Sequence, residues 1–68
     1  MKAALGRNVK DLRRSLMMSQ TDLAERARIR RALVSDIERK AANPTLDSLV
    51  RIATALGVET ADLLGAGR

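Results

Sequence analysis

Apolar residues recur every three or four positions along most of the chain, which is the spacing of one face of a helix. The first such stripe predicts a helix over about residues 4–17. Its apolar members are Leu5, Val9, Leu12 and Leu16. No stretch alternates between apolar and polar residues over a useful length, so the pattern predicts an all-α domain.

A second helix of about eight residues is predicted to follow Ser19, which is a favourable N-cap. Asp22, three positions later, resembles the acidic member of a capping box. The residues expected to face inward are Leu23, Ala24 and Ala27. The two alanines are small side chains at the positions where the next helix would approach.

A third helix is predicted over residues 30–39, after a connection of only about three residues. Two short helices joined so tightly cross at a steep angle, as in a helix-turn-helix. The side chains expected to dock this helix on the core are Ile29, Val34 and Ile37. Leu33 is expected to be partly exposed.

The C-terminal third predicts one more helix and a final short turn. Pro44 ends the preceding segment, Thr45 can cap the next helix, and Gly57 can stop it. The predicted stripe of that helix is Leu46, Leu49, Val50, Ala53 and Leu56. Thr60 can cap the last turn, which carries Leu63 and Leu64, and residues 65–68 are expected to fray. We expect one domain over residues 1–68, with its core at about 4–64.

Positive charge is concentrated in the middle of the chain. The net charge is +5 over 68 residues. Residues 26–40 contain six basic side chains against the two acidic ones of Asp36 and Glu38. The six are Arg26, Arg28, Arg30, Arg31, Arg39 and Lys40. Such an asymmetry suggests a surface for a polyanion, although arginines that only solvate a helix face are the simpler alternative.

Composition narrows the possible functions. The chain has no Cys and no His, so it offers neither a thiolate metal site nor the usual general base. An enzyme is therefore the least favoured reading, and we expect no cofactor, metal or small-molecule ligand. The absence of aromatic residues counts against base stacking with single-stranded RNA.

Size and hydropathy suggest how the domain is stabilised and where it resides. A domain this small buries only about 60% of the surface of its unfolded chain, so we expect self-association to help stabilise it. No run of 18 apolar residues exists, and Lys2 is followed by no long apolar segment of the kind found in signal peptides. We therefore expect a cytoplasmic protein.

The middle of the sequence resembles the Cro/phage-repressor helix-turn-helix family, often called the XRE family. The resemblance is carried by the order Gln20, Leu23-Ala24, Ala27, Ile29, Val34 and Ile37-Glu38-Arg39. It is extended by "LRR" before this segment and by "NPTLDSL" and "IATALGV" after it, so it covers about residues 5 to 64. It implies a five-helix fold whose third helix lies in the DNA major groove, and a homodimer on a near-palindromic operator.

The resemblance also implies which residues face the bases of double-stranded DNA. These are Arg31, Ala32, Ser35 and Asp36. Arg31 is the strongest candidate, because Arg can bridge O6 and N7 of guanine. Asp36 can accept from cytosine N4, or it can instead brace Arg39 or Lys40, which lie three and four residues later.

A second implied group contacts phosphates. Its members are Gln20, Arg28, Arg30, Arg39, Lys40 and Asn43. Arg28 and Lys40 stand where the family usually has Gly, and Arg30 stands where Ser or Thr usually caps the third helix. Either phosphate affinity offsets the lost backbone freedom and capping, or the two helices end differently here.

Two structural assignments complete the comparison with the family. Arg13 and Glu38 match a pair that forms an internal salt bridge. Val58, Leu63 and Leu64, with Leu46 as a further candidate, match the dimer surface. Of these, Leu64 is expected to be the most exposed, whereas Leu63 and Val58 can alternatively close the core.

Two other functions fit the charge pattern less well. One is a helical protein-interaction module that uses its basic face on an acidic protein. The other is a membrane-surface binder, which is disfavoured because the apolar side of the basic helix is needed for the core. Family members of this size include phage repressors, restriction-modification controllers and antitoxin-type autorepressors.

Overall fold

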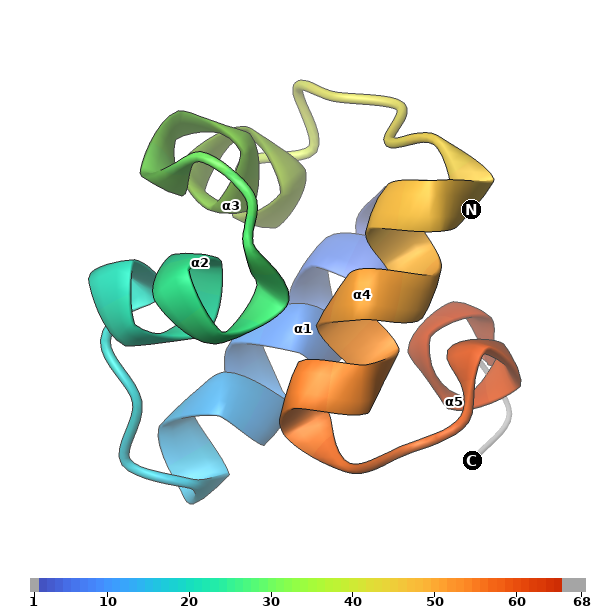
Figure 1. Ribbon diagram of the computed structural model, residues 1–68. Helices are drawn as coiled ribbons and strands as arrows, with labels where there is room; N and C mark the ends of the chain where they lie inside the picture. Colours follow the sequence, from blue (N-terminus) through green and yellow to red (C-terminus); the bar gives the residue numbers. More distant parts are fainter. Residues whose placement is uncertain (1, 66–68) are drawn as a thin grey trace.

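The computed structural model describes residues 2–65, and this part of the chain contains five helices and no strand. The helices are α1 (Lys2–Ser15), α2 (Gln20–Ala27), α3 (Arg31–Glu38), α4 (Leu46–Leu56) and α5 (Thr60–Leu64) (Figure 1). The prediction of an all-α, five-helix fold is confirmed. The expected fraying of residues 66–68 lies outside the described residues.

The helix pair α2 and α3 and the C-terminal pair α4 and α5 occupy different sides of the molecule. In Figure 1, α2 and α3 lie on the left, α4 and α5 lie toward the right, and α1 lies behind α4. The helix α1 packs against both α3 and α5, while α4 packs against α2 and α5. The helix-turn-helix pair and the C-terminal pair therefore present different faces of the molecule.

All five helices contribute to one apolar core. Its buried members are Leu5, Val9, Met18, Leu23, Ala24, Ala27, Val34, Ile37, Ile52, Ala53, Leu56 and Leu63. The prediction that α2 and α3 dock through Leu23, the two alanines, Val34 and Ile37 is confirmed. Leu33 is half-buried, as expected.

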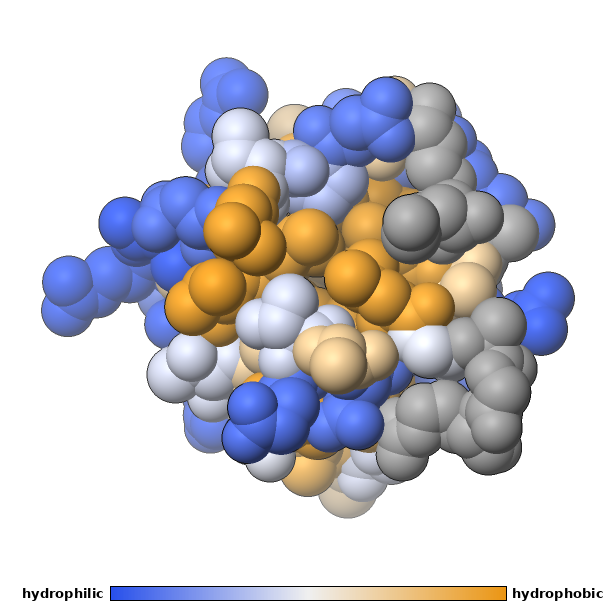
Figure 2. All heavy atoms as spheres, turned by 90° about the vertical axis from the view of Figure 1, so that its right-hand side faces the viewer, coloured by the Kyte–Doolittle hydropathy of each residue, from blue (hydrophilic) through white to orange (hydrophobic). Residues whose placement is uncertain are grey.

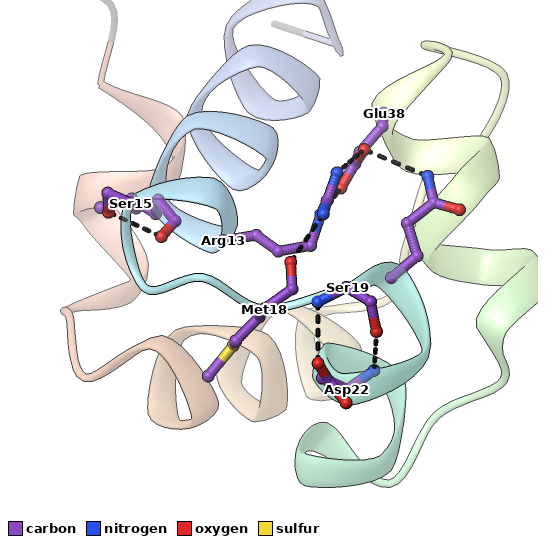
Figure 3. Close-up of polar contacts among 8 residues, drawn as sticks. Arg13, Ser15, Met18, Ser19, Asp22 and Glu38 are labelled. Carbon is purple, nitrogen blue, oxygen red and sulfur yellow. Dashed lines mark hydrogen bonds and ion pairs between the residues drawn. The ribbon is translucent and has the colours of Figure 1, made fainter.

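Two predicted N-caps are confirmed. The Ser19 hydroxyl accepts from the Asp22 backbone N–H at 2.9 Å, and the Asp22 carboxylate accepts from the Ser19 N–H at 2.9 Å (Figure 3). Thr45 Oγ1 accepts from the Ser48 N–H at 3.1 Å. These bonds satisfy backbone donors that the first turn of a helix leaves without a partner.

The four helices α1 to α4 end in the same way. A residue with positive φ follows each helix, and the next backbone N–H donates to the carbonyl five residues back, as in a Schellman motif. The four residues are Met17, Arg28, Lys40 and Gly57. Only Gly57, the predicted stop of α4, is a glycine.

The predicted end of α1 is wrong by two residues, and this changes which side chains are buried. The helix ends at Ser15 because Met17 adopts a φ of 58° and turns the chain. Leu16, predicted to continue the apolar stripe, is 49% exposed. Met18, which the spacing did not select, is buried in its place.

The predicted stripe of α4 is also partly wrong. Leu46 and Val50 are exposed, by 71% and 46%, whereas Ile52, absent from the predicted stripe, is fully buried. The apolar residues of α4 are spread around most of its circumference, so periodicity alone is compatible with more than one buried stripe. At the next turn, Glu59 rather than Thr60 precedes α5, and its N–H donates to Asp62 Oδ2 at 2.9 Å.

Candidate nucleic-acid interface

The helix α3 has one face in the core and the opposite face open to solvent. Val34 and Ile37 are buried. Arg31 and Ala32 are exposed, and Ser35 and Asp36 are half-buried. The four residues predicted to face DNA bases therefore have accessible surface on one short helix.

Exposed basic residues flank both ends of α3. Arg28 and Arg30 precede the helix, and Arg39 and Lys40 follow it. Within residues 2–65, no acidic side chain pairs with Arg28, Arg30, Arg31 or Lys40. Asn43, the last predicted phosphate contact, is exposed in the loop beyond. The cationic side chains are therefore available to an external polyanion.

Arg28 and Lys40 are both in the left-handed region, with φ values of 58° and 65°. The helices therefore end where the family's glycines would place their ends, and the alternative that they end differently is wrong. A non-glycine residue in this region costs about 1 kcal/mol. This cost arises at both ends of α3, before it at Arg28 and after it at Lys40, and both residues are basic.

The N-terminus of α3 has no side-chain cap. Arg30 occupies the N-cap position with extended backbone, and its side chain accepts no hydrogen bond. A guanidinium has no acceptor to offer. This helix therefore lacks the usual N-capping interaction, which is worth about 1 kcal/mol.

Asp36 braces a neighbouring arginine. Its Oδ1 accepts from Arg39 Nη2 at 2.9 Å, and the side chains of Arg39 and Asp36 are 69% and 42% exposed. This confirms the bracing alternative for Asp36. A contact between Asp36 and a cytosine remains a prediction, since exposed pairs of this kind contribute little stability and can rearrange.

A buried ion pair connects α3 to α1. Arg13 Nε lies 2.7 Å from Glu38 Oε2, and Arg13 Nη2 lies 3.0 Å from Oε1 (Figure 3). The two side chains are only 11% and 5% exposed. Arg13 Nη1 also donates to the Met18 carbonyl at 2.8 Å. The predicted structural pair is confirmed, and it fixes the end of α3 to α1 and to the turn before α2.

The same pair shifts the pKa of both partners. Burial by itself raises the pKa of Glu38, but hydrogen bonds from Arg13 and Gln20 outweigh burial and hold this pKa below its usual value. The hydrogen bond to Glu38 raises the pKa of Arg13 further above its ordinary value. Glu38 is therefore ionised in the folded chain at neutral pH.

Gln20 has a second role that sequence reasoning missed. Its Nε2 donates to Glu38 Oε1 at 3.2 Å, so the first residue of α2 joins the ion pair. The predicted phosphate contact of Gln20 remains a prediction. The family resemblance assigned Gln20 to a DNA phosphate, but nothing in the sequence marked its side chain as a partner of Glu38.

Gly6 is a further residue that sequence reasoning missed. A Cβ added here would lie 2.6 Å from the carbonyl oxygen of Ile37 and 3.3 Å from that of Glu38. The helix α1 therefore approaches the backbone at the end of α3 so closely that only a glycine fits at this position. Gly6 and Arg13 together determine where the C-terminal end of α3 lies.

The predicted dimer surface needs two corrections. Leu63 is fully buried within the single chain, where it closes the core, so it is not a surface residue. The expectation that Leu64 is the most exposed member is also wrong, because Leu64 and Val58 are half-buried whereas Leu46 is 71% exposed. Val50, also on α4, is exposed. Figure 2 shows apolar side chains near the middle of this face, with hydrophilic ones around its edges.

No group of three or more His, Cys, Asp or Glu side chains in residues 2–65 is placed to hold a metal ion. In the same range, no helix has the length and apolar character needed to cross a bilayer.

Known proteins are similar to this chain in sequence and in fold. The model of a family described as helix-turn-helix matches residues 9–63. The immunity repressor protein of Bacillus phage phi105 is 36% identical over 61 residues, which are 90% of this chain and 42% of that protein. The control protein C.BamHI of Bacillus amyloliquefaciens is 43% identical over 60 residues, which are 87% of this chain and 74% of that protein.

The fold comparison agrees with the sequence comparison. The restriction-modification controller protein C.AhdI from Aeromonas hydrophila superposes with a TM-score of 0.88 at 31% identity, over 91% of this chain and 94% of that one. The chain spans less than half of the phage repressor but most of the two controllers. On the match of residues 9–63 and this shared architecture, the chain belongs to the helix-turn-helix family of the Cro/phage-repressor (XRE) type, whose members are DNA-binding transcriptional regulators.

Proposed function

We propose that this protein regulates transcription by binding a near-palindromic DNA operator as a homodimer, with α3 in the major groove. The observation that carries the proposal is the exposed face of α3, which is flanked at both ends by exposed basic side chains, of which only Arg39 has an acidic partner. A helix of this width fits the major groove, and phosphates run along both of its rims. The names of the relatives, a repressor and two controllers, support a regulatory role.

In this proposal the residues of α3 divide into two kinds of contact. Arg31, Ala32, Ser35 and Asp36 face base edges. Phosphates are contacted by Gln20, Arg28, Arg30, Arg39, Lys40 and Asn43. Because phosphate neutralisation releases counterions, affinity should fall steeply as the salt concentration rises. The left-handed strain at Arg28 and Lys40 supports this division, since it places two unpaired cations where glycine would be less costly.

The homodimer is proposed to form through the face of α4 and α5. In Figure 1, α3 lies on the left and α5 on the right, so the side of α4 and α5 that is turned away from α3 can be covered while α3 remains free. It includes the exposed Leu46 and Val50 and the half-buried Val58 and Leu64. A two-fold dimer then reads two half-sites about 10–10.5 base pairs apart.

Replacement of Arg31 by alanine tests the base contacts. We expect Arg31→Ala to cost about 1–3 kcal/mol on the preferred duplex and less on random DNA, because a bidentate contact to guanine is lost. Lys40→Ala serves as the comparison and should weaken both duplexes about equally while lowering the salt dependence. The measurement is a titration of each variant on both duplexes at several salt concentrations. Equal losses for Arg31→Ala on both duplexes would make Arg31 a phosphate contact.

Replacement of Leu64 by glutamate tests the dimer surface. A charge at this half-buried position should disfavour the dimer, in which this face is buried, so sedimentation equilibrium should show monomers. Binding to the full operator, measured by titration, should be weakened. Leu16→Glu is the matched control, because Leu16 is an exposed leucine at the end of α1, outside the face of α4 and α5. Circular dichroism checks that both variants are folded. An unchanged dimer in folded Leu64→Glu would refute this surface.

A further inference from the structure

The C-terminal end of α5 is held by a side chain from α1. Asn8 Nδ2 lies 2.8 Å from the carbonyl oxygen of Leu63, 3.1 Å from that of Gly65 and 3.4 Å from that of Asp62. The amide nitrogen has two N–H donors, which are shared among the three acceptors. Asn8 therefore caps a helix from which it is separated by more than fifty residues.

The helix α5 depends on such external support. It has five residues, too few to persist as an isolated helix in water. Its last carbonyls have no donor within the helix, as at any helix C-terminus. Among its side chains, Leu63 alone is fully buried. Contacts that hold α5 in place therefore include the packing of Leu63 and of the half-buried Leu64 on the core, and the Asn8 amide.

The same short segment contributes to the proposed partner surface. Leu64 lies on α5, and Val58 lies in the turn that leads into it. Asn8 is on α1, which also holds Glu38 at the end of α3 through Arg13. One helix therefore carries separate polar anchors for the DNA-reading helix and for the C-terminal helix.

We infer that Asn8 is a positioning residue that sets the orientation of the α5 surface and thereby the strength of dimerisation. This inference rests on the proposed homodimer. Asn8 acts through α5 and has no direct contact with DNA. Loss of its amide donors leaves the three carbonyls without this partner, so α5 samples orientations in which Leu64 and Val58 no longer form one surface.

The test compares Asn8→Ala and Asn8→Asp with the control Asp11→Ala, an exposed residue on the same helix. The alanine removes the donors, and an ionised aspartate can only accept, so it faces carbonyl oxygens without a proton to share. Hydrogen exchange of amides in residues 61–65, relative to those in α2 and α3, reports the position of α5. Sedimentation equilibrium reports dimerisation.

We expect both Asn8 variants to speed exchange in α5 selectively and to weaken dimerisation by about tenfold, since hydrogen bonds of ordinary strength are lost. Asp11→Ala should change neither. Unchanged α5 exchange, or faster exchange with undiminished dimerisation, would overturn the inference. So would unfolding of both Asn8 variants, because Asn8 would then support the whole fold. A wild-type chain that is monomeric throughout would instead refute the proposed dimer, and α5 exchange would still decide whether Asn8 positions α5.

Discussion

Replacement of Gly6 by alanine is expected to destabilise the folded chain by about 2–3 kcal/mol, although alanine is the better helix former. The added methyl group would lie 2.6 Å from the Ile37 carbonyl oxygen, and that atom belongs to backbone that cannot rotate away. For a domain of this size the melting temperature should fall by roughly 10–20 °C. DNA affinity should also decrease at temperatures at which the variant is still folded, because the clash displaces the end of α3.

Gly57→Ala is the control for this prediction. Gly57 has a φ of 73° and nothing within 4 Å of an added Cβ, so only backbone strain opposes the change. It should cost about 1 kcal/mol and leave α3 in place. Thermal unfolding of both variants followed by circular dichroism gives the comparison. A Gly6→Ala protein as stable as the wild type, as helix propensity alone predicts, would show that the close approach of α1 to α3 is wrong.

The second large effect is expected at Glu38. Glu38→Ala leaves the guanidinium of Arg13 buried without a carboxylate, which typically costs about 3–5 kcal/mol. Total stability is typically only about 0.05–0.15 kcal/mol per residue, so this loss is a large part of what a small domain has. Urea unfolding should therefore show a strongly lowered midpoint or no folded baseline at all.

Two further variants separate the ion pair from other effects. Asp47→Ala breaks the exposed pair with Arg51, whose atoms are equally close at 2.7 Å, and should cost less than about 1 kcal/mol. Arg13→Met combined with Glu38→Leu removes both charges and should recover much of the stability lost in Glu38→Ala. If Glu38→Ala keeps wild-type stability and only DNA affinity falls, Glu38 is not the structural residue described here.

The Glu38 contribution should also depend on pH. The pKa of Glu38 is lowered in the folded chain, because the hydrogen bonds of Arg13 and Gln20 outweigh its burial. The ion pair therefore stabilises the chain above the unfolded pKa, near 4.5, and this stability is lost as the pH falls through the folded value. Glu38→Gln, which cannot titrate, should show a flatter stability profile below about pH 5.

The sequence predicted the elements whose signals are local. Ser19 and Thr45 begin helices because their hydroxyls accept from nearby backbone N–H groups, and Gly57 ends one because it tolerates positive φ. The exposed basic flanks of α3 followed from the same reasoning, since docking through Val34 and Ile37 leaves one direction for the arginines. The Arg13–Glu38 pair came from the family resemblance and is confirmed by its geometry.

Features that depend on tertiary contact were missed. Gly6 carries no side-chain signal, and its close approach to Ile37 appears only when α1 and α3 are packed. Asn8 reads as an ordinary polar residue until α5 folds against it. Leu16 was misplaced because Met17, which is not a glycine, nevertheless adopts positive φ and breaks the helical stripe. Gly6 and Asn8 were missed because the residues that they contact are distant in the sequence. Leu16 was misplaced because the backbone conformation of Met17 is one that its residue type disfavours.

The measurement that tests the central claim most directly is selection of binding sites from a random duplex DNA library with the purified wild-type protein. The exposed face of α3, with basic residues flanking both of its ends, and the proposed two-fold dimer predict enrichment of one near-palindromic site, with half-sites about 10–10.5 base pairs apart. Failure to enrich any duplex sequence over the starting pool, by protein shown to be folded, would contradict sequence-specific DNA binding through α3.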